Sequence, residues 1–243
     1  MFDHVTIRVT DRIASELFYD TVLARLGIDR TYRTATFSEW RDLLLTAGDD
    51  ANPPTRRVHV AFVAPAREQV DEFWRAGTEA GYPGDGQPGP RPAYGDDYYG
   101  AGLLDPDGNV AEAVHHDTLR RGGVIDHLWI RVTDVAAAKR FYETIAPHAA
   151  LRLTDDTPDR VRFAGGTGSF SLVPGAPTEH VHVAFPTDDD ADIQRFHQAA
   201  TDAGYRSNGA PAERPQYHPG YYAAYVLDPD GNNVEIVNHH RTG

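Results

Sequence analysis

Six residues of metal-binding type occur as two sets of three, and the second set repeats the first 123 positions later. The sets are His4, His59 and Glu112, and then His127, His182 and Glu235. Two neutral imidazoles and one carboxylate can hold divalent iron or manganese on one face and leave its other positions open to water or substrate. A lone histidine at the start of a strand is more simply interpreted as a polar edge residue. Recurrence of all three residues at identical spacing favours the metal.

The composition restricts which ligands are available. The chain has no cysteine, so a bound metal must use histidine, aspartate, glutamate or water. The formal net charge of -13, with no offsetting run of lysine or arginine, argues against nucleic acid or an anionic membrane as a partner. The beginning of the sequence does not resemble a signal peptide, and no apolar stretch is long enough to span a membrane. We expect a cytoplasmic protein that is a monomer, with its repeats arranged as a pseudo-dimer, or a homodimer.

The four histidines lie within longer repeated segments, and each glutamate lies three residues after one. DHVTIRVTD at 3–11 returns as DHLWIRVTD at 126–134, HVAF at 59–62 returns at 182–185, and LLDPDGN at 103–109 returns as VLDPDGN at 226–232. No net insertion separates these landmarks, so the chain is an internal duplication. We expect two homologous domains, residues 1–117 and 124–243, joined by a short linker at 118–123.

The elements that must position these residues follow one order four times. Residues 4–9 alternate as a half-buried strand does, and Asp11 can cap a following helix that Gly27 ends. A second strand begins at His59, and the second helix, which follows it, ends at Gly81. The strand-rich stretches after the two helices are residues 35–46 and 98–115. The order βαβββ, four times over, predicts an α+β fold with four modules in two tandem domains and two cup-shaped mixed sheets.

These segments resemble the vicinal oxygen chelate superfamily, which includes glyoxalase I, fosfomycin- and bleomycin-resistance proteins and extradiol dioxygenases. The resemblance rests on the two DH-strand segments with their FYD and FYE helices, on HVAF twice, and on DPDGNVAEAV and DPDGNNVEIV. It implies metal ligands at the three residues of each set, because these match the first strands of the modules and the glutamate-bearing last strands. It also implies a small-molecule substrate and a divalent metal, with Fe²⁺ or Mn²⁺ favoured and Zn²⁺ or Ni²⁺ as alternatives.

One departure from the family pattern makes the sequence resemble some members of the superfamily more than others. Glyoxalase I-like members use a fourth protein ligand, a glutamate in the last strand of the first module. The matching stretches here are RDLLLTAG at 41–48 and SFSLVPG at 169–175, where the only carboxylate is Asp42, out of register. The sequence therefore looks more like the three-ligand dioxygenases and fosfomycin-resistance proteins.

Tyrosines before each glutamate-bearing hairpin are further candidates. A phenol beside a metal-bound oxyanion can donate a hydrogen bond or act as a general acid. The set comprises Tyr94, Tyr98, Tyr99, Tyr217, Tyr221 and Tyr222. Half should belong to the core, because adjacent residues on a strand face opposite sides. As catalytic candidates we expect Tyr94, Tyr99, Tyr217 and Tyr222, together with His218, which is an acid or base candidate because the first copy has Gly95 there.

Other conspicuous residues are interpreted as structural. The two DPDGN segments suit tight turns and act by presenting Glu112 and Glu235. The pairs His115-His116 and His239-His240 are expected to extend into solvent. Gly165 to Gly168 is expected to form a hairpin turn, since it lacks the phosphate-loop pattern.

The leading functional hypothesis is a metal-dependent enzyme that binds a small oxygenated metabolite through two adjacent oxygens, with dioxygenase or lyase/isomerase chemistry. The alternative is a metal-independent protein that sequesters an antibiotic, of the bleomycin-resistance type. Glu235 is expected to belong to the more active centre, because the second copy keeps His218. Each centre can lie within one domain, or His4 can join His182 and Glu235 while His127 joins His59 and Glu112. The self-contained arrangement is favoured by analogy with the extradiol dioxygenases.

Overall fold

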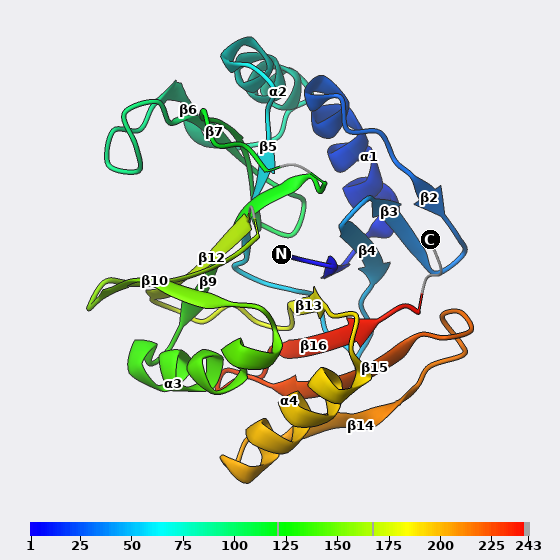
Figure 1. Ribbon diagram of the computed structural model, residues 1–243. Helices are drawn as coiled ribbons and strands as arrows, with labels where there is room; N and C mark the ends of the chain where they lie inside the picture. Colours follow the sequence, from blue (N-terminus) through cyan, green and yellow to red (C-terminus); the bar gives the residue numbers. More distant parts are fainter. Residues whose placement is uncertain (121, 167, 241–243) are drawn as a thin grey trace.

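Four βαβββ modules follow one another along the chain in a computed structural model that describes residues 1–120, 122–166 and 168–240 (Figure 1). The first module comprises β1 (His4–Val9), α1 (Arg12–Leu23), the short helix η1 (Ala24–Leu26), β2 (Tyr32–Arg33), β3 (Phe37–Trp40) and β4 (Leu43–Ala47). The second comprises β5 (His59–Val63), α2 (Arg67–Glu79), β6 (Gly84–Pro90), β7 (Tyr99–Leu104) and β8 (Val110–His115). The third comprises β9 (Ile125–Val132), α3 (Val135–Ile145), η2 (Ala146–His148), β10 (Arg152–Thr157), β11 (Arg160–Gly165) and β12 (Gly168–Pro174). The fourth comprises β13 (His182–Pro186), α4 (Asp190–Asp202), β14 (Ser207–Glu213), β15 (Tyr222–Leu227) and β16 (Asn233–Asn238). The predicted α+β fold with four such modules is confirmed.

Each eight-stranded mixed sheet takes one module from each half of the chain. The first sheet has the order β14-β15-β16-β13-β1-β4-β3-β2, and the second has the order β10-β11-β12-β9-β5-β8-β7-β6. The seams between modules are the antiparallel pairs of β1 with β13 and of β5 with β9. We call the concave faces of these sheets the β1/β13 cup and the β5/β9 cup. The two halves are therefore interleaved through both sheets.

Local signals in the sequence account for the helix boundaries. Asp11 accepts hydrogen bonds from the backbone N–H groups of Ile13 and Ala14, which caps the start of α1. Gly27 closes η1 with φ 73°, a left-handed conformation that glycine adopts without strain. The hairpin expected at Gly165 to Gly168 agrees with the antiparallel pairing of β11 with β12; Thr167 lies outside the described residues.

The helices and one face of each sheet enclose the core. Buried Val60 and Phe62 of β5 belong to the large apolar cluster, whereas Ala61 between them faces the other way, into the cup. Helices α1 and α2 lie together, as do α3 and α4, and α2 and α4 pack against their own modules' hairpins (Figure 1). Leu17 of α1 is not part of this core, since it is 62% exposed. Among the described residues, no helix has both the length and the apolar character needed to cross a bilayer.

Candidate metal centres

Strand register brings one histidine from the first half of the chain beside a histidine and a glutamate from the second half. In the β1/β13 cup, His4 pairs with Ala184, and Ala184 pairs with Glu235 on the next strand. Paired residues on adjacent strands point to the same face, and so does His182, two positions before Ala184. The small side chain of Ala184 leaves the space between the three larger ones open.

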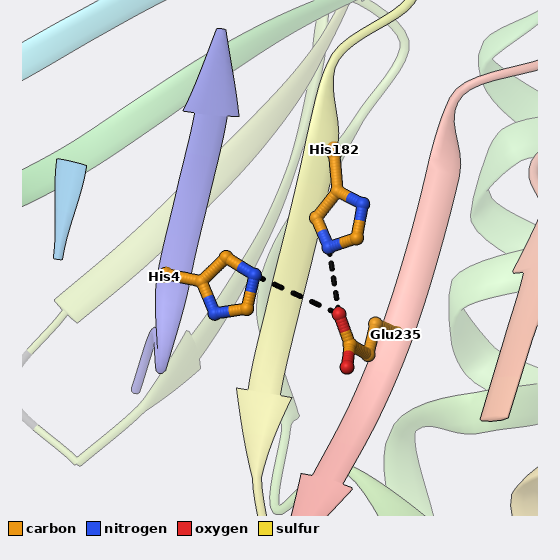
Figure 2. A group of neighbouring side chains, drawn as sticks. All are labelled: His4, His182 and Glu235. Atoms are coloured by element: carbon orange, nitrogen blue, oxygen red, sulfur yellow. Dashed lines mark hydrogen bonds and ion pairs between the residues drawn. The ribbon is translucent and has the colours of Figure 1, made fainter. Parts of the chain in front are cut away.

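The three donor atoms converge on one point (Figure 2). Nε2 of His182 lies 2.7 Å from Oε2 of Glu235, and Nε2 of His4 lies 3.6 Å from the same oxygen. The side chain of Glu235 is 1% exposed, while each histidine side chain is 14% exposed. The histidines thus border the cup, and the carboxylate lies beneath them.

The β5/β9 cup repeats this arrangement with the reciprocal residues. His127 pairs with Ala61, and Ala61 pairs with Glu112. Nε2 of His59 lies 2.7 Å from Oε2 of Glu112, and Nε2 of His127 lies 3.7 Å from it. In both cups the three potential ligand atoms lie within 4.8 Å of one another.

The favoured arrangement, in which each half contains its own centre, is wrong. His4 joins His182 and Glu235, and His127 joins His59 and Glu112, because the hydrogen-bonded seams connect β1 to β13 and β5 to β9. The linker at 118–123 is long enough for either arrangement, so its length does not distinguish them. Its residue Arg120 is buried and pairs with Asp42, while Arg121 lies outside the described residues.

In each centre an aspartate orients one histidine: half-buried Asp3 in the β1/β13 cup and buried Asp126 in the β5/β9 cup. Asp3 accepts from Nδ1 of His4 at 2.8 Å, and Asp126 accepts from Nδ1 of His127 at 2.9 Å. Burial raises the pKa of Asp3, but hydrogen bonds from His239 and His4 outweigh it and hold that pKa well below its usual range. Burial lowers the pKa of His4, yet the hydrogen bond to Asp3 and the charge of Glu235 raise it overall. A proton fixed on Nδ1 leaves the lone pair on Nε2, directed at the centre.

The far side of each aspartate binds a histidine that was expected to extend into solvent. Nε2 of His239 lies 2.9 Å from Asp3, and Nε2 of His116 lies 3.0 Å from Asp126. The expectation was wrong for these two residues, because each meets an aspartate that is distant in the sequence or lies beyond the linker. Asp3 directly precedes β1, and Asp126 lies in β9. Their neighbours are also held by hydrogen bonds: Nδ1 of His115 lies 2.9 Å from the Ala64 carbonyl oxygen and Nδ1 of His240 lies 2.7 Å from that of Gly220.

Among the tyrosines, the structure corrects the choice made within each adjacent pair. The hydroxyl of Tyr98 donates to Oε1 of Glu112 at 3.1 Å, and that of Tyr221 donates to Oε1 of Glu235 at 2.7 Å. Tyr99 and Tyr222, favoured from the sequence, face the helices instead. The Tyr99 hydroxyl donates to Asp71 of α2, and the Tyr222 hydroxyl lies 3.5 Å from the Gln194 side chain of α4.

The remaining three candidates lie at the margins of the cups. Tyr94 is 47% exposed and packs edge-on against Tyr98, and Tyr217 is 62% exposed and packs against Tyr221. Nε2 of His218 lies 2.8 Å from Nδ1 of His239. His218, His239, Asp3 and His4 therefore form one hydrogen-bonded chain that leads from the protein surface to the centre.

Asp42, the one carboxylate near the fourth-ligand position, serves another purpose. It forms a buried ion pair with Arg120 and accepts a hydrogen bond from the backbone N–H of Val124 at 2.8 Å. The position paired with His127 on β12 is Ser169. Among the described residues, neither centre has a second carboxylate as a fourth ligand, in agreement with the departure seen in the sequence.

The donor sets fit a divalent cation. Burial raises the pKa of Glu235, but the hydrogen bond and charge of His182 lower it overall, and the same holds for Glu112 with His59. Burial lowers the pKa of His182. Anionic carboxylates and neutral imidazoles are the forms that bind metal, and two histidines with one carboxylate form the facial set of non-haem Fe²⁺ oxygenases.

The two halves of the chain each match the same family model. The model describes the glyoxalase/bleomycin resistance protein/dioxygenase superfamily and matches residues 1–113 and 124–236. The chain belongs to this superfamily. No curated protein matches the sequence of this superfamily member.

Solved structures share its fold. Glyoxalase I from Zea mays has a TM-score of 0.71 at 18% identity, with 98% of this chain and 92% of that chain covered. Its V278E mutant has a TM-score of 0.72 at the same identity and coverage. A candidate dioxygenase from Bacillus subtilis subsp. subtilis str. 168 has a TM-score of 0.65 at 16% identity, covering 99% of this superfamily member and 85% of that chain.

Proposed function

We propose that the protein is a metal-dependent enzyme that binds a small oxygenated metabolite through two adjacent oxygens and performs dioxygenase or lyase/isomerase chemistry. The observation that carries this proposal is the convergence of two imidazoles and one carboxylate in each of two cups. Three protein ligands on one face leave room for a bidentate substrate. A bound divalent ion supplies positive charge that stabilises a developing enolate or catecholate.

The surrounding side chains hold the ligands for this purpose. In the β5/β9 cup, Tyr98 donates to one oxygen of Glu112, so the other oxygen faces the imidazoles. Asp126 holds the Nδ1 proton of His127, which keeps Nε2 free to bind the ion. Trp129 stacks on His59 with ring centroids 5.1 Å apart, which restricts that imidazole and excludes water from one side.

We assign substrate binding to the β5/β9 cup. A cavity of about 480 Å³ opens there and is lined by His127, Trp129 and Tyr94 among others. In the β1/β13 cup, Tyr225 pairs with Glu235 and is 9% exposed, whereas the equivalent residue beside Glu112 is Gly102. The sequence predicts that the Glu235 centre is the more active one. The cavity favours the Glu112 centre.

Metal stoichiometry tests the proposal. Protein purified without an affinity tag should bind close to two divalent ions per chain, measured by elemental analysis after equilibration with Fe²⁺ under anaerobic conditions. His127→Ala or Glu235→Ala should each remove about one ion, because two remaining ligands cannot enforce the geometry.

Double variants test the interleaved arrangement in the same measurement. His4→Ala with Glu235→Ala should remove one ion, whereas His4→Ala with Glu112→Ala should remove both. Unchanged metal content in all variants would refute the ligand assignment. A protein that binds catechol equally well with and without metal would instead support the sequestering alternative.

A further inference from the structure

The two cups carry opposite charges at one equivalent position. In the β5/β9 cup, Arg162 pairs with Ser171, and Ser171 pairs with Trp129. In the β1/β13 cup, Glu39 pairs with Leu44, and Leu44 pairs with Thr6, so Glu39 stands where Arg162 stands in the other cup. Both the strand register and the 123-residue repeat make Arg162 and Glu39 equivalent.

Arg162 lies on the wall of the cavity, beside the metal centre. Its guanidinium donates to Oγ of Ser169 at 3.0 Å, and Ser169 is the strand neighbour of His127. Adjacent strands are spaced by about 5 Å. A small molecule bound to an ion at His127 can therefore also reach the guanidinium of Arg162.

Among the described residues, no carboxylate forms an ion pair with the guanidinium of Arg162. Arg160, the other arginine of the cavity wall, is paired with Asp155 at 2.6 Å. The carboxylate of Asp126 faces His116 and His127, and that of Asp97 accepts from the backbone N–H of Asp117. An arginine at the end of the first strand occurs in both cups, as Arg8 and Arg131, so it does not distinguish them.

Resting on the proposed function, we infer that the β5/β9 centre selects substrates that carry a carboxylate or similar anionic group a short distance from their chelating oxygens. Arg162 is the specificity-determining residue, since a guanidinium binds a carboxylate through paired N–H donors. Trp129 and Tyr94 supply an aromatic wall against which a planar substrate packs. The β1/β13 centre, with Glu39 in place of the arginine, does not share this preference.

Binding of neutral and acidic chelators separates this inference from the function on which it rests. Catechol, 2,3-dihydroxybenzoate and 3,4-dihydroxybenzoate are titrated calorimetrically into the Fe²⁺-loaded His4→Ala protein without dioxygen, so that only the β5/β9 centre holds metal. The two acids place the carboxylate at different distances from the chelating oxygens. At least one should bind about tenfold more tightly than catechol, and added salt should reduce that advantage.

Arg162→Gln should abolish the advantage of the acid while leaving catechol affinity unchanged. Glu39→Gln, the matched control at the equivalent position of the other cup, should leave both affinities unchanged. Catechol binding with no preference for either acid, or a preference that survives Arg162→Gln, would overturn this inference alone. Absence of binding by all three probes would refute the proposed function, and this inference with it.

Discussion

Replacing Asp3 with asparagine should weaken metal binding at one centre and spare the other. Asp3 accepts from His4 at 2.8 Å and from His239 at 2.9 Å, and its charge raises the pKa of His4. Asparagine keeps the size but has one acceptor oxygen and no charge. The imidazole of His4 then loses both its fixed orientation and part of its basicity. Loss of such a partner weakens metal affinity by about 10- to 100-fold.

The affinity is measured by competition between the protein and a chelating dye for Zn²⁺ in a Glu112→Ala background, which leaves only the β1/β13 centre. Asp126→Asn in that background is the matched control and should have no effect, because Asp126 contacts His127 and His116 of the other cup. In a Glu235→Ala background the two aspartate variants should exchange their effects. An Asp3→Asn protein with unchanged Zn²⁺ affinity would show that the hydrogen bond to His4 does not contribute to metal binding.

Two further predictions concern stability. Arg120→Met leaves the carboxylate of Asp42 buried without its ion-pair partner, so urea unfolding should show a loss of about 3 kcal/mol; the double variant with Asp42→Asn should lose less. The hydrogen bond to Asp126 raises the pKa of His116, so its protonated form stabilises the folded state below about pH 6.5, and this contribution is lost as the pH rises through the raised pKa. The unfolding free-energy difference between wild type and His116→Gln should therefore be larger at pH 6 than at pH 9; a difference independent of pH, or one that persists in an Asp126→Asn background, would contradict this assignment.

The sequence was sufficient to predict the four modules and the six residues that converge. Both follow from the duplication, because each histidine or glutamate has a counterpart at the same spacing. The pairing of halves did not follow, because the strand seams depend on contacts between distant segments. The hydrogen bond between Asp3 and His239 joins residues 236 positions apart, and no local pattern indicates it.

The error over the tyrosines has a more local cause. The hairpin after Tyr98 pairs Gly102 with Glu112, so counting back in twos from Gly102 places Tyr98 on the glutamate's face and Tyr99 on the other. This register depends on the turn that joins β7 to β8. The order βαβββ requires strands at β6 and β14, but the sequence does not show their positions, because a run such as GDGQPGP has the composition of a loop. Both strands lie at sheet edges, where proline is tolerated.

Because each sheet combines strands from both halves of the chain, neither sheet can be completed until the second half has been synthesised. When the first 117 residues have left the ribosome, β1 and β5 still lack the strands that pair with one side of each, since β13 and β9 are not yet made. Unpaired strand edges promote association with other chains. A nascent chain stalled at the linker thus exposes the unpaired edges of β1 and β5, through which two such chains can pair with each other. Completion of translation removes this hazard by supplying both missing strands within the same molecule.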